Sequence, residues 1–285
     1  MPTTIAVLAP GAMGSAVAQR LTEHGARVLT SLAGRSAATA QRATATGMIA
    51  ADDAEIAGAD IILSIVPPGE ALALAERLAA AITRQQTTPI FVDCNAVSVE
   101  TVRKVEEIVE SSGARFVDAG IIGFPPRPGH PGPSFFVSGE HTGDVAVLEE
   151  LGLDLRVVQG PVGAASALKM SYAGINKGVT AVAAAMVLAA TRAGAADALR
   201  EELGRSQPQL LAKIDGALPD MVPKAYRWVA EMREIAAFLG PDHPANLVYE
   251  GFARLFEHIA ADEKGEQTDV AQLTAFAEGE KTGKG

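Results

Sequence analysis

Short apolar runs and alanine-rich segments alternate along the first 160 residues of the chain. The runs are rich in Val, Ile and Leu, as in IILSIV at residues 61–66, which is typical of strands buried on both faces. The segments between them have the apolar spacing of helices, and one begins with Ser98 as an expected N-cap. The predicted strands are Thr4–Leu8, Ala26–Ser31, Ile61–Val66, Pro89–Asp93 and Ala114–Asp118, and the predicted helices are Ser15–His24, Ala37–Ala45, Glu70–Arg84 and Ser98–Ser111. This alternation predicts an α/β fold with a doubly wound parallel sheet.

The pattern changes after this region. Residues 123–132 contain four prolines and three glycines and predict a shaped loop, with late edge strands expected at Ser134–Ser138 and Arg156–Gln159. Beyond these the pattern is helical throughout. The expected helices are Gly163–Arg192, Ala195–Glu202, Gln207–Ala217, Pro223–Leu239 and Asn246–Ala260. We expect a sheet domain of residues 1–160 and an all-α domain of residues 161–285. The last ~20 residues are polar, and we expect the chain to fray at its end.

The charge balance excludes several classes of partner. The chain has 24 Lys and Arg residues against 34 Asp and Glu residues, a formal net charge of −10. Phosphate backbones and anionic lipids would repel such a chain, so we expect no nucleic-acid partner and no membrane association. The most apolar long stretch, Val179–Ala190, is about 12 residues long and too short to span a bilayer. With no signal peptide recognisable after the N-terminus, we expect a cytoplasmic protein.

Cysteine and histidine usage excludes two kinds of site. The single cysteine, Cys94, allows no internal disulfide, and no base adjacent in sequence marks it as a nucleophile, so we interpret it as a buried packing residue. The five histidines show no ligand spacing. We therefore expect no metal site.

A glycine-containing turn follows the first predicted strand. It reads Ala9-Pro10-Gly11-Ala12-Met13-Gly14 and leads into a helix, which is the context of the Rossmann dinucleotide-binding turn, here with alanine at the first glycine position. Gly11 would let the backbone approach a pyrophosphate, and Gly14 would allow close packing of helix and strand. The helix N-terminus would add amide donors. Residues 9–14 are therefore expected to bind a nicotinamide dinucleotide.

The end of the second predicted strand indicates which dinucleotide. Enzymes that prefer NAD usually place Asp or Glu about 20 residues after the glycines, but no acidic residue occurs between Glu23 and Asp52. Arg35 and Ser36 stand there instead, with donors suited to a 2′-phosphate, and Arg42 could assist from the next helix. The prediction is NADP.

Two further loops follow strand C-termini and are expected to line the cofactor. Val66 and Pro67 follow the third strand, and Asn95 follows the fourth. Ligands of open α/β sheets lie outside these carboxyl ends.

Three segments together resemble a known family. They are the turn Gly11-Ala12-Met13-Gly14, the stretch Val117–Gly123, and Gly160-Pro161-Val162-Gly163-Ala164-Ala165-Ser166-Ala167-Leu168-Lys169, which matches a G-x-x-G-x-G-x-x-x-K motif with alanine for the third glycine. In these segments the sequence resembles the β-hydroxyacid dehydrogenases, which include 6-phosphogluconate and hydroxyisobutyrate dehydrogenases. The resemblance covers the whole chain, with the segments in the same order. The segment Lys224–Met232 resembles a subgroup with a short helical second domain. The resemblance implies a Rossmann domain followed by an all-α domain, hydride transfer between NADP(H) and a small hydroxy acid or carbonyl, and a homodimer.

The resemblance also implies Lys169 as the catalytic lysine, which would donate or accept the proton at the substrate oxygen. At 100° per residue Tyr172 and Asn176 share its helix face, and we expect Asn176 to be catalytic and Tyr172 to bind substrate. The family has asparagine where this chain has Ala173, and its decarboxylating members have glutamate where Asn176 stands. Because asparagine is no general acid, decarboxylation is not expected.

The substrate loop departs from the family pattern as well. It reads Ile122-Gly123-Phe124 where the family has Ser-Gly-Gly, which predicts substrate contacts from these three residues and a less polar substrate. Trp228, on a helix expected to close the cleft, is a further substrate-binding candidate beside its alternative as a core residue. The Ala-rich helix Gly163–Arg192 carries more apolar surface than a small helical domain easily buries, which agrees with a homodimer.

Two alternatives stay open. An imine reductase shares the two-domain design; the apolar Ile122–Phe124 loop favours it, and Lys169 argues against it because those enzymes commonly carry Asp or Tyr there. A non-catalytic NADP-binding protein is the other alternative, favoured by the altered loop and by Ala173.

Overall fold

The structure is a computed structural model and describes residues 2–127, 129–130 and 132–279. Its contacts divide the chain into two compact units, Met1–Met170 and Ser171–Gly285. The contact boundary falls inside the long helix α7 (Ala164–Arg192), which runs through both units. The domain boundary predicted near Gly160 stays a prediction.

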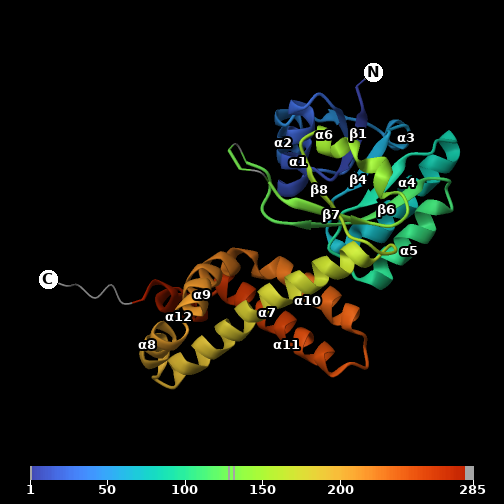
Figure 1. The fold of residues 1–285 in the computed structure, drawn as a ribbon. Helices are drawn as coiled ribbons and strands as arrows, with labels where there is room; N and C mark the ends of the chain where they lie inside the picture. Colours follow the sequence, from blue (N-terminus) through green and yellow to red (C-terminus); the bar gives the residue numbers. More distant parts are fainter. Residues whose placement is uncertain (1, 128, 131, 280–285) are drawn as a thin grey trace. The chain divides into compact units, whose positions relative to one another are not determined.

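The first unit is built on a single sheet (Figure 1). Eight strands of the described chain lie in the order β3-β2-β1-β4-β5-β6-β7-β8. Their bounds are β1 (Thr4–Leu8), β2 (Arg27–Thr30), β3 (Ile49–Ala50), β4 (Ile61–Ser64), β5 (Ile90–Asp93), β6 (Arg115–Ile122), β7 (Ser134–Ser138) and β8 (Asp154–Val157). All neighbouring pairs are parallel except β6 and β7, which are antiparallel. The predicted doubly wound α/β fold is confirmed.

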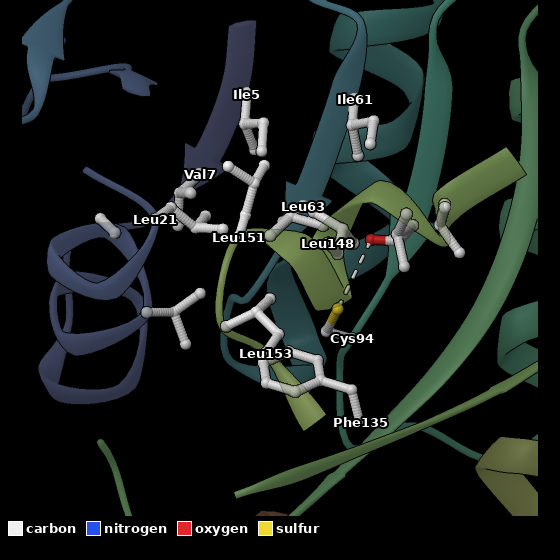
Figure 2. Packing of buried hydrophobic residues seen from close by; sticks show 14 of the residues in the cluster. Ile5, Val7, Leu21, Ile61, Leu63, Cys94, Phe135, Leu148, Leu151 and Leu153 are labelled. Atoms are coloured by element: carbon white, nitrogen blue, oxygen red, sulfur yellow. Dashed lines mark hydrogen bonds between the residues drawn. The ribbon is translucent and has the colours of Figure 1, made fainter. Parts of the chain in front are cut away.

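Helices cover both faces of this sheet. On one face α1 (Ala12–Glu23), α2 (Ala37–Ala45) and α6 (Val147–Glu150) contribute to one buried cluster, part of which is drawn in Figure 2. On the other face α3 (Asp53–Ala57), α4 (Ala71–Gln85) and α5 (Val99–Glu110) contribute to a second. Alternate strand residues enter the two clusters, as Val7 and Leu8 do, because successive side chains of a strand point to opposite faces.

The second unit is helical throughout its described part, which confirms the all-α prediction. Beyond its share of α7 it contains α8 (Ala196–Ser206), α9 (Pro208–Met221), α10 (Ala225–Leu239), α11 (Pro244–Lys264) and α12 (Thr268–Glu278). Helix α10 packs along α11, and α9 packs on α12 and α8.

One predicted strand end was wrong, and several elements were not predicted. Strand β6 does not end at Asp118 but continues to Ile122, because β7 pairs with its second half. The short elements β3, α3 and α6 were not predicted, although the capping box of Asp52 and Glu55 marks the start of α3. Helix α12 was not predicted within the polar C-terminal segment, and its Leu273 and Phe276 are buried; fraying was expected at the end of the chain. Residues 280–285 lie outside the described residues.

Helix α7 also alters the expectation about membranes. It is 29 residues long, and an 18-residue window within it has a mean hydropathy of 1.5, so among the described helices it alone is long and apolar enough to cross a bilayer. The argument from the short stretch Val179–Ala190 therefore does not hold for the whole helix. Half of that window is buried inside the structure, as in the core helix of a soluble protein, so this is weak evidence for a span.

Candidate functional site

The strand register brings the predicted loops to one edge of the sheet. Leu8 of β1, Ser64 of β4, Asp93 of β5 and Asp118 of β6 are successive partners in one row across four parallel strands. The residues that follow them therefore emerge together at the carboxyl edge. This edge flanks β1 and β4, where the strand order reverses, which is the usual ligand position in open α/β sheets.

The glycine turn forms the start of α1. Gly11 is the N-cap residue, and the first helical amides have no partners within the helix, so they can donate to an anion. A β-carbon on Gly14 would lie 2.1 Å from the carbonyl oxygen of Ala9, so this glycine is required for helix α1 to pack on β1. A β-carbon on Gly11 would meet no atom within 4 Å, and its φ of −74° suits any residue. Apart from its modest value as an N-cap, no contact among the described residues requires glycine at position 11, which fits a ligand that approaches the backbone there.

We expect a Gly14→Ala variant to lose about 1–3 kcal/mol of stability, because the Ala9 carbonyl or helix α1 must move. Urea unfolding of the purified protein measures this. Gly11→Ala is the matched control and should stay within about 1 kcal/mol of the wild type, the cost of a poorer N-cap. Equal stabilities of Gly14→Ala and the wild type would contradict the packing role.

A pocket of about 330 Å³ lies beside the turn, at the ends of β1, β2 and β4. Arg35 lines it and lies 3.4 Å from a carboxylate oxygen of Glu70. Glu70 ends the short 3-10 helix η1 (Pro68–Glu70) and was not among the predicted site residues. Ser36 is exposed and caps α2, accepting a hydrogen bond from the Thr39 amide. The pocket is lined by Leu8, Ala9, Ser31, Ala33, Gly34, Arg35, Val66, Glu70, Ala73, Leu74 and Arg77.

Arg42 lies apart from this pocket lining but close to the glycine turn. Its guanidinium donates to the carbonyl oxygen of Pro10 at 3.1 Å. This hydrogen bond connects α2 to the backbone of the glycine turn. Arg42 can therefore stabilise the turn as well as attract an anion.

Asn95 joins two of the predicted cofactor loops. Its side-chain oxygen accepts a hydrogen bond from the Val66 amide at 2.7 Å, and its side-chain nitrogen donates to Ser64 Oγ at 2.8 Å. Asn95 is 3% exposed. Its side chain, which follows β5, thus bonds the end of β4 to that of β5, and we call this arrangement the Asn95 clamp. Pro67, the next residue after Val66, is exposed at the edge.

A buried carboxylate lies directly behind this clamp. Asp93 is 1% exposed; its Oδ1 accepts a hydrogen bond from the Asn95 amide, and its Oδ2 has no hydrogen-bond partner among the described residues. Burial, with the charge of neighbouring Asp118, raises the pKa of Asp93 from 3.8 to about 7, against the lowering effect of its bonds to Asn95. Burial also raises the pKa of the adjacent Cys94 thiol, which packs in the core as expected (Figure 2).

Asp118 fixes the start of the helix that carries Lys169. Its carboxylate accepts hydrogen bonds from the Gly163 amide (2.9 Å), the Ser166 amide (3.1 Å), Ser166 Oγ (2.6 Å) and Ser138 Oγ (2.9 Å). A carboxylate at a helix N-terminus also complements the helix dipole. Asp118 was quoted only as part of the substrate stretch, and its capping role was missed.

Lys169 reaches the edge of the sheet because of a glycine on β6. A β-carbon on Gly120 would lie 2.9 Å from the Lys169 β-carbon and 2.9 Å from the Ala165 carbonyl oxygen, so α7 can approach β6 only over glycine. Gly120 lies two residues beyond the row of Asp93 and Asp118, at the carboxyl edge. The lysine therefore lies against the strand that leads into Ile122-Gly123-Phe124.

The predicted substrate loop is partly strand. Ile122 ends β6 and is half-buried, and Gly123 has a φ of +129° that favours glycine. Phe124 is 68% exposed, unusual for so large an apolar side chain. The structure thus places one apolar residue at the end of the strand and one in the open loop.

Tyr172 and Asn176 follow Lys169 on the uninterrupted helix α7. The Asn176 side chain donates to the Tyr172 carbonyl oxygen at 2.9 Å and accepts from Lys213 Nζ at 3.0 Å. Tyr172 is 51% exposed. Lys213, on α9, is a further cation next to Asn176 that sequence spacing gave no means of finding.

Trp228 lies within the helical unit, where its ring packs edge to face on Phe256 with centroids 5.2 Å apart. The Lys177 ammonium lies 5.0 Å above the same ring and is paired with Glu231. These contacts fit the core alternative for Trp228, and its substrate role stays a prediction.

No group of three or more His, Cys, Asp or Glu side chains able to hold a metal occurs in the described ranges. The expectation of no metal site stays a prediction.

Two family models match separate parts of the chain. Residues 4–151 match the NAD binding domain of 6-phosphogluconate dehydrogenase, and residues 190–259 match a domain of unknown function. An uncharacterized 28.5 kDa protein of Methanothermus fervidus is 28% identical over 235 residues, covering 81% of this chain and 89% of that one.

Solved structures are similar over nearly the whole length. A conserved protein of unknown function, described as structurally similar to 3-hydroxyacid dehydrogenases, is 26% identical with a TM-score of 0.71 (96% of this chain, 99% of that one). Mycobacterium tuberculosis 3-hydroxyisobutyrate dehydrogenase with L-serine is 19% identical with a TM-score of 0.62 (98% and 99%). An imine reductase of Myxococcus stipitatus in complex with NAD+ is 18% identical with a TM-score of 0.57 (97% and 99%). The last two share the fold.

Proposed function

The chain belongs to the family whose nucleotide-binding domain is that of 6-phosphogluconate dehydrogenase, and from this premise we propose that it is an NADP-dependent oxidoreductase. Its reaction would transfer hydride between NADP(H) and a small hydroxy acid or carbonyl compound. The observation that carries the proposal is the packing of Lys169 on Gly120 at the carboxyl edge of the sheet. The glycine turn leaves the sheet at the same edge, after β1.

The residues at this edge fit a phosphorylated dinucleotide. The turn of residues 9–14 offers backbone donors at the start of α1, and Gly11 leaves room for a close approach. Arg35 lines the neighbouring pocket with a planar fork of donors, and exposed Ser36 adds a hydroxyl. Val66 and Pro67 complete the edge, with Asn95 acting through its bond to Val66.

When bound, NADPH would supply hydride to the substrate carbonyl carbon. The Lys169 ammonium would hold the carbonyl oxygen and donate a proton to it, giving the hydroxyl; in oxidation the neutral amine would take that proton back. Asp118 and Gly120 are positioning residues in this proposal, because they fix the first turns of α7. Asn176 and Tyr172 would contact substrate polar groups.

The substrate contacts favour a less polar substrate than the usual family members take. The side chains of Ile122 and Phe124 offer no donor to a carboxylate, and Phe124 presents an exposed aromatic ring. The same observation favours an imine reductase as the second candidate. Purified protein with NADPH, offered 3-keto acids and semialdehydes against cyclic imines, separates the two by which class is reduced. No turnover on any substrate despite tight NADPH binding would favour a non-catalytic NADP-binding protein.

Calorimetric titration with NADPH and NADH tests the cofactor. We expect tighter binding of NADPH, and we expect Arg35→Ala to weaken it by about 1–3 kcal/mol, the worth of a charge-assisted pair, with little change for NADH. Arg84→Ala, an exposed arginine in the last turn of α4, is the matched control and should bind NADPH like the wild type. If neither nucleotide binds the wild type, the proposed function is wrong.

We also propose a homodimer formed through the helical unit. An apolar groove of about 540 Å³ lies along α7, lined by residues that include Ile175, Val182 and Met186, whose side chains are at least half exposed. So much exposed apolar surface is unusual for a monomer. Analytical ultracentrifugation at micromolar concentration should give a dimer mass, and Met186→Glu should shift it toward monomer. A monomeric wild type would contradict the dimer.

A further inference from the structure

The cofactor pocket contains an acidic side chain that does not belong to the strand where such a residue is expected. Glu70 lines the pocket together with Arg35, and its Oε2 lies 3.4 Å from Arg35 Nη2. Glu70 comes from the turn after β4, whereas Arg35 follows β2. The arrangement of strands in the sheet, rather than sequence proximity, brings this carboxylate to the candidate 2′-phosphate site.

A second arginine lines the same pocket but has another partner. Arg77 lies two turns along α4 from Glu70, and its guanidinium lies 3.7 Å from Asp53, which does not line the pocket. Of the charged side chains that line the pocket in the described structure, two are therefore cationic and Glu70 is anionic. Both members of the Arg35–Glu70 pair are partly exposed, 38% and 50%, so each can change partner at little cost.

The pair acts oppositely on the two dinucleotides. A 2′-phosphate bound by Arg35 would displace Glu70 from the guanidinium and would meet a carboxylate of like charge across the pocket. A ribose 2′-hydroxyl has no charge to repel and can donate a hydrogen bond to the same carboxylate, as acidic residues do in sites that prefer NAD. Glu70 thus weakens the preference for the phosphorylated cofactor that Arg35 creates.

Given the proposed function, on which this inference rests, we propose that Glu70 is a specificity-determining residue of the cofactor site. It sets how far the site prefers a phosphorylated dinucleotide over an unphosphorylated one. The site then still prefers the phosphorylated cofactor, but less strongly than Arg35 alone would make it.

Binding, without turnover, tests this. Calorimetry with NADPH, NADH, 2′,5′-ADP and 5′-AMP is run on the wild type and on Glu70→Gln, which keeps the size of the side chain and removes its charge. We expect Glu70→Gln to bind NADPH and 2′,5′-ADP about 5- to 10-fold more tightly. Binding of NADH and 5′-AMP should be unchanged or up to about 3-fold weaker. The gain for NADPH should shrink as salt is raised, because the repulsion is screened.

Glu76→Gln is the matched control, since Glu76 is an exposed glutamate of α4 outside the pocket lining, and its affinities should equal those of the wild type. If the ratio of NADPH to NADH affinity stays within twofold between the wild type and Glu70→Gln, the role of Glu70 is wrong while the proposed function stands. If neither NADPH nor NADH binds the wild type, the proposed function falls and this inference falls with it.

Discussion

Replacing Lys169 with methionine is expected to lower kcat by about 10²- to 10⁴-fold, the usual contribution of a general acid or base. Methionine keeps most of the apolar stem and removes the ammonium, while the β-carbon against Gly120 is unchanged, so α7 should keep its position. The measurement is the rate of NADPH consumption on the substrate class found by the carbonyl and imine screen. NADPH affinity should change less than about 3-fold.

An exposed lysine provides the comparison. Lys264→Met, at the end of α11, removes an ammonium from the surface and should leave kcat unchanged. If the Lys169→Met enzyme kept more than a tenth of wild-type kcat, Lys169 would not be the general acid or base. The polar partners Tyr172 and Asn176 would then be the next residues to substitute.

Substitution of Asp93 by asparagine is expected to change how stability depends on pH. Because the folded-state pKa of Asp93 is about 7 and its ordinary value is 3.8, the folded protein holds a proton between these values that the unfolded chain has released. Stability should therefore fall as the pH rises from about 4 to about 7 and stay low above that. The full cost is about 4 kcal/mol at most.

Asparagine keeps an oxygen for the Asn95 amide and cannot ionise, so the variant should be more stable than the wild type at pH 8 and nearly equal to it at pH 4. Urea unfolding of both proteins across this range measures the difference. Asp242→Asn, an exposed aspartate, should reproduce the wild-type profile. A wild-type stability that rises between pH 5 and pH 8 while Asp93→Asn shows the same slope would contradict an ionisable, buried Asp93.

The fold was predictable because its signals are local. Each buried strand is an apolar run of about five residues, and the helices between them repeat at helical spacing, so their alternation predicts the parallel sheet. The missed pieces are short or depend on distant pairing: β3 has two residues, α3 has five despite its capping box, and the second half of β6 is a strand only because β7 pairs with it. Helix α12 was missed because its few buried side chains stand among polar ones.

The same distinction between local and distant signals separates the parts of the candidate site that could be predicted from those that could not. The glycine turn could be found from sequence, because the need for Gly14 arises from contacts within one strand–turn–helix unit. The ion pair of Glu70 with Arg35 and the placement of Asp93 next to Asp118 could not be found from sequence. Each brings together residues 25 or more positions apart through the order and register of the strands. The sequence also gave no sign that Asn95 bonds to the backbone of another loop.

The Asn95 clamp gives the segment after β4 one anchored end and one end that is easy to alter. The Val66 amide donates a hydrogen bond to the buried side chain of Asn95. Glu70, four residues later, is half exposed, and its described contact with the loop after β2 is the ion pair with Arg35. Substitutions at Glu70 should therefore leave the sheet edge intact. A cofactor site arranged in this way can drift between related dinucleotides during evolution by single changes, without passing through unstable intermediates.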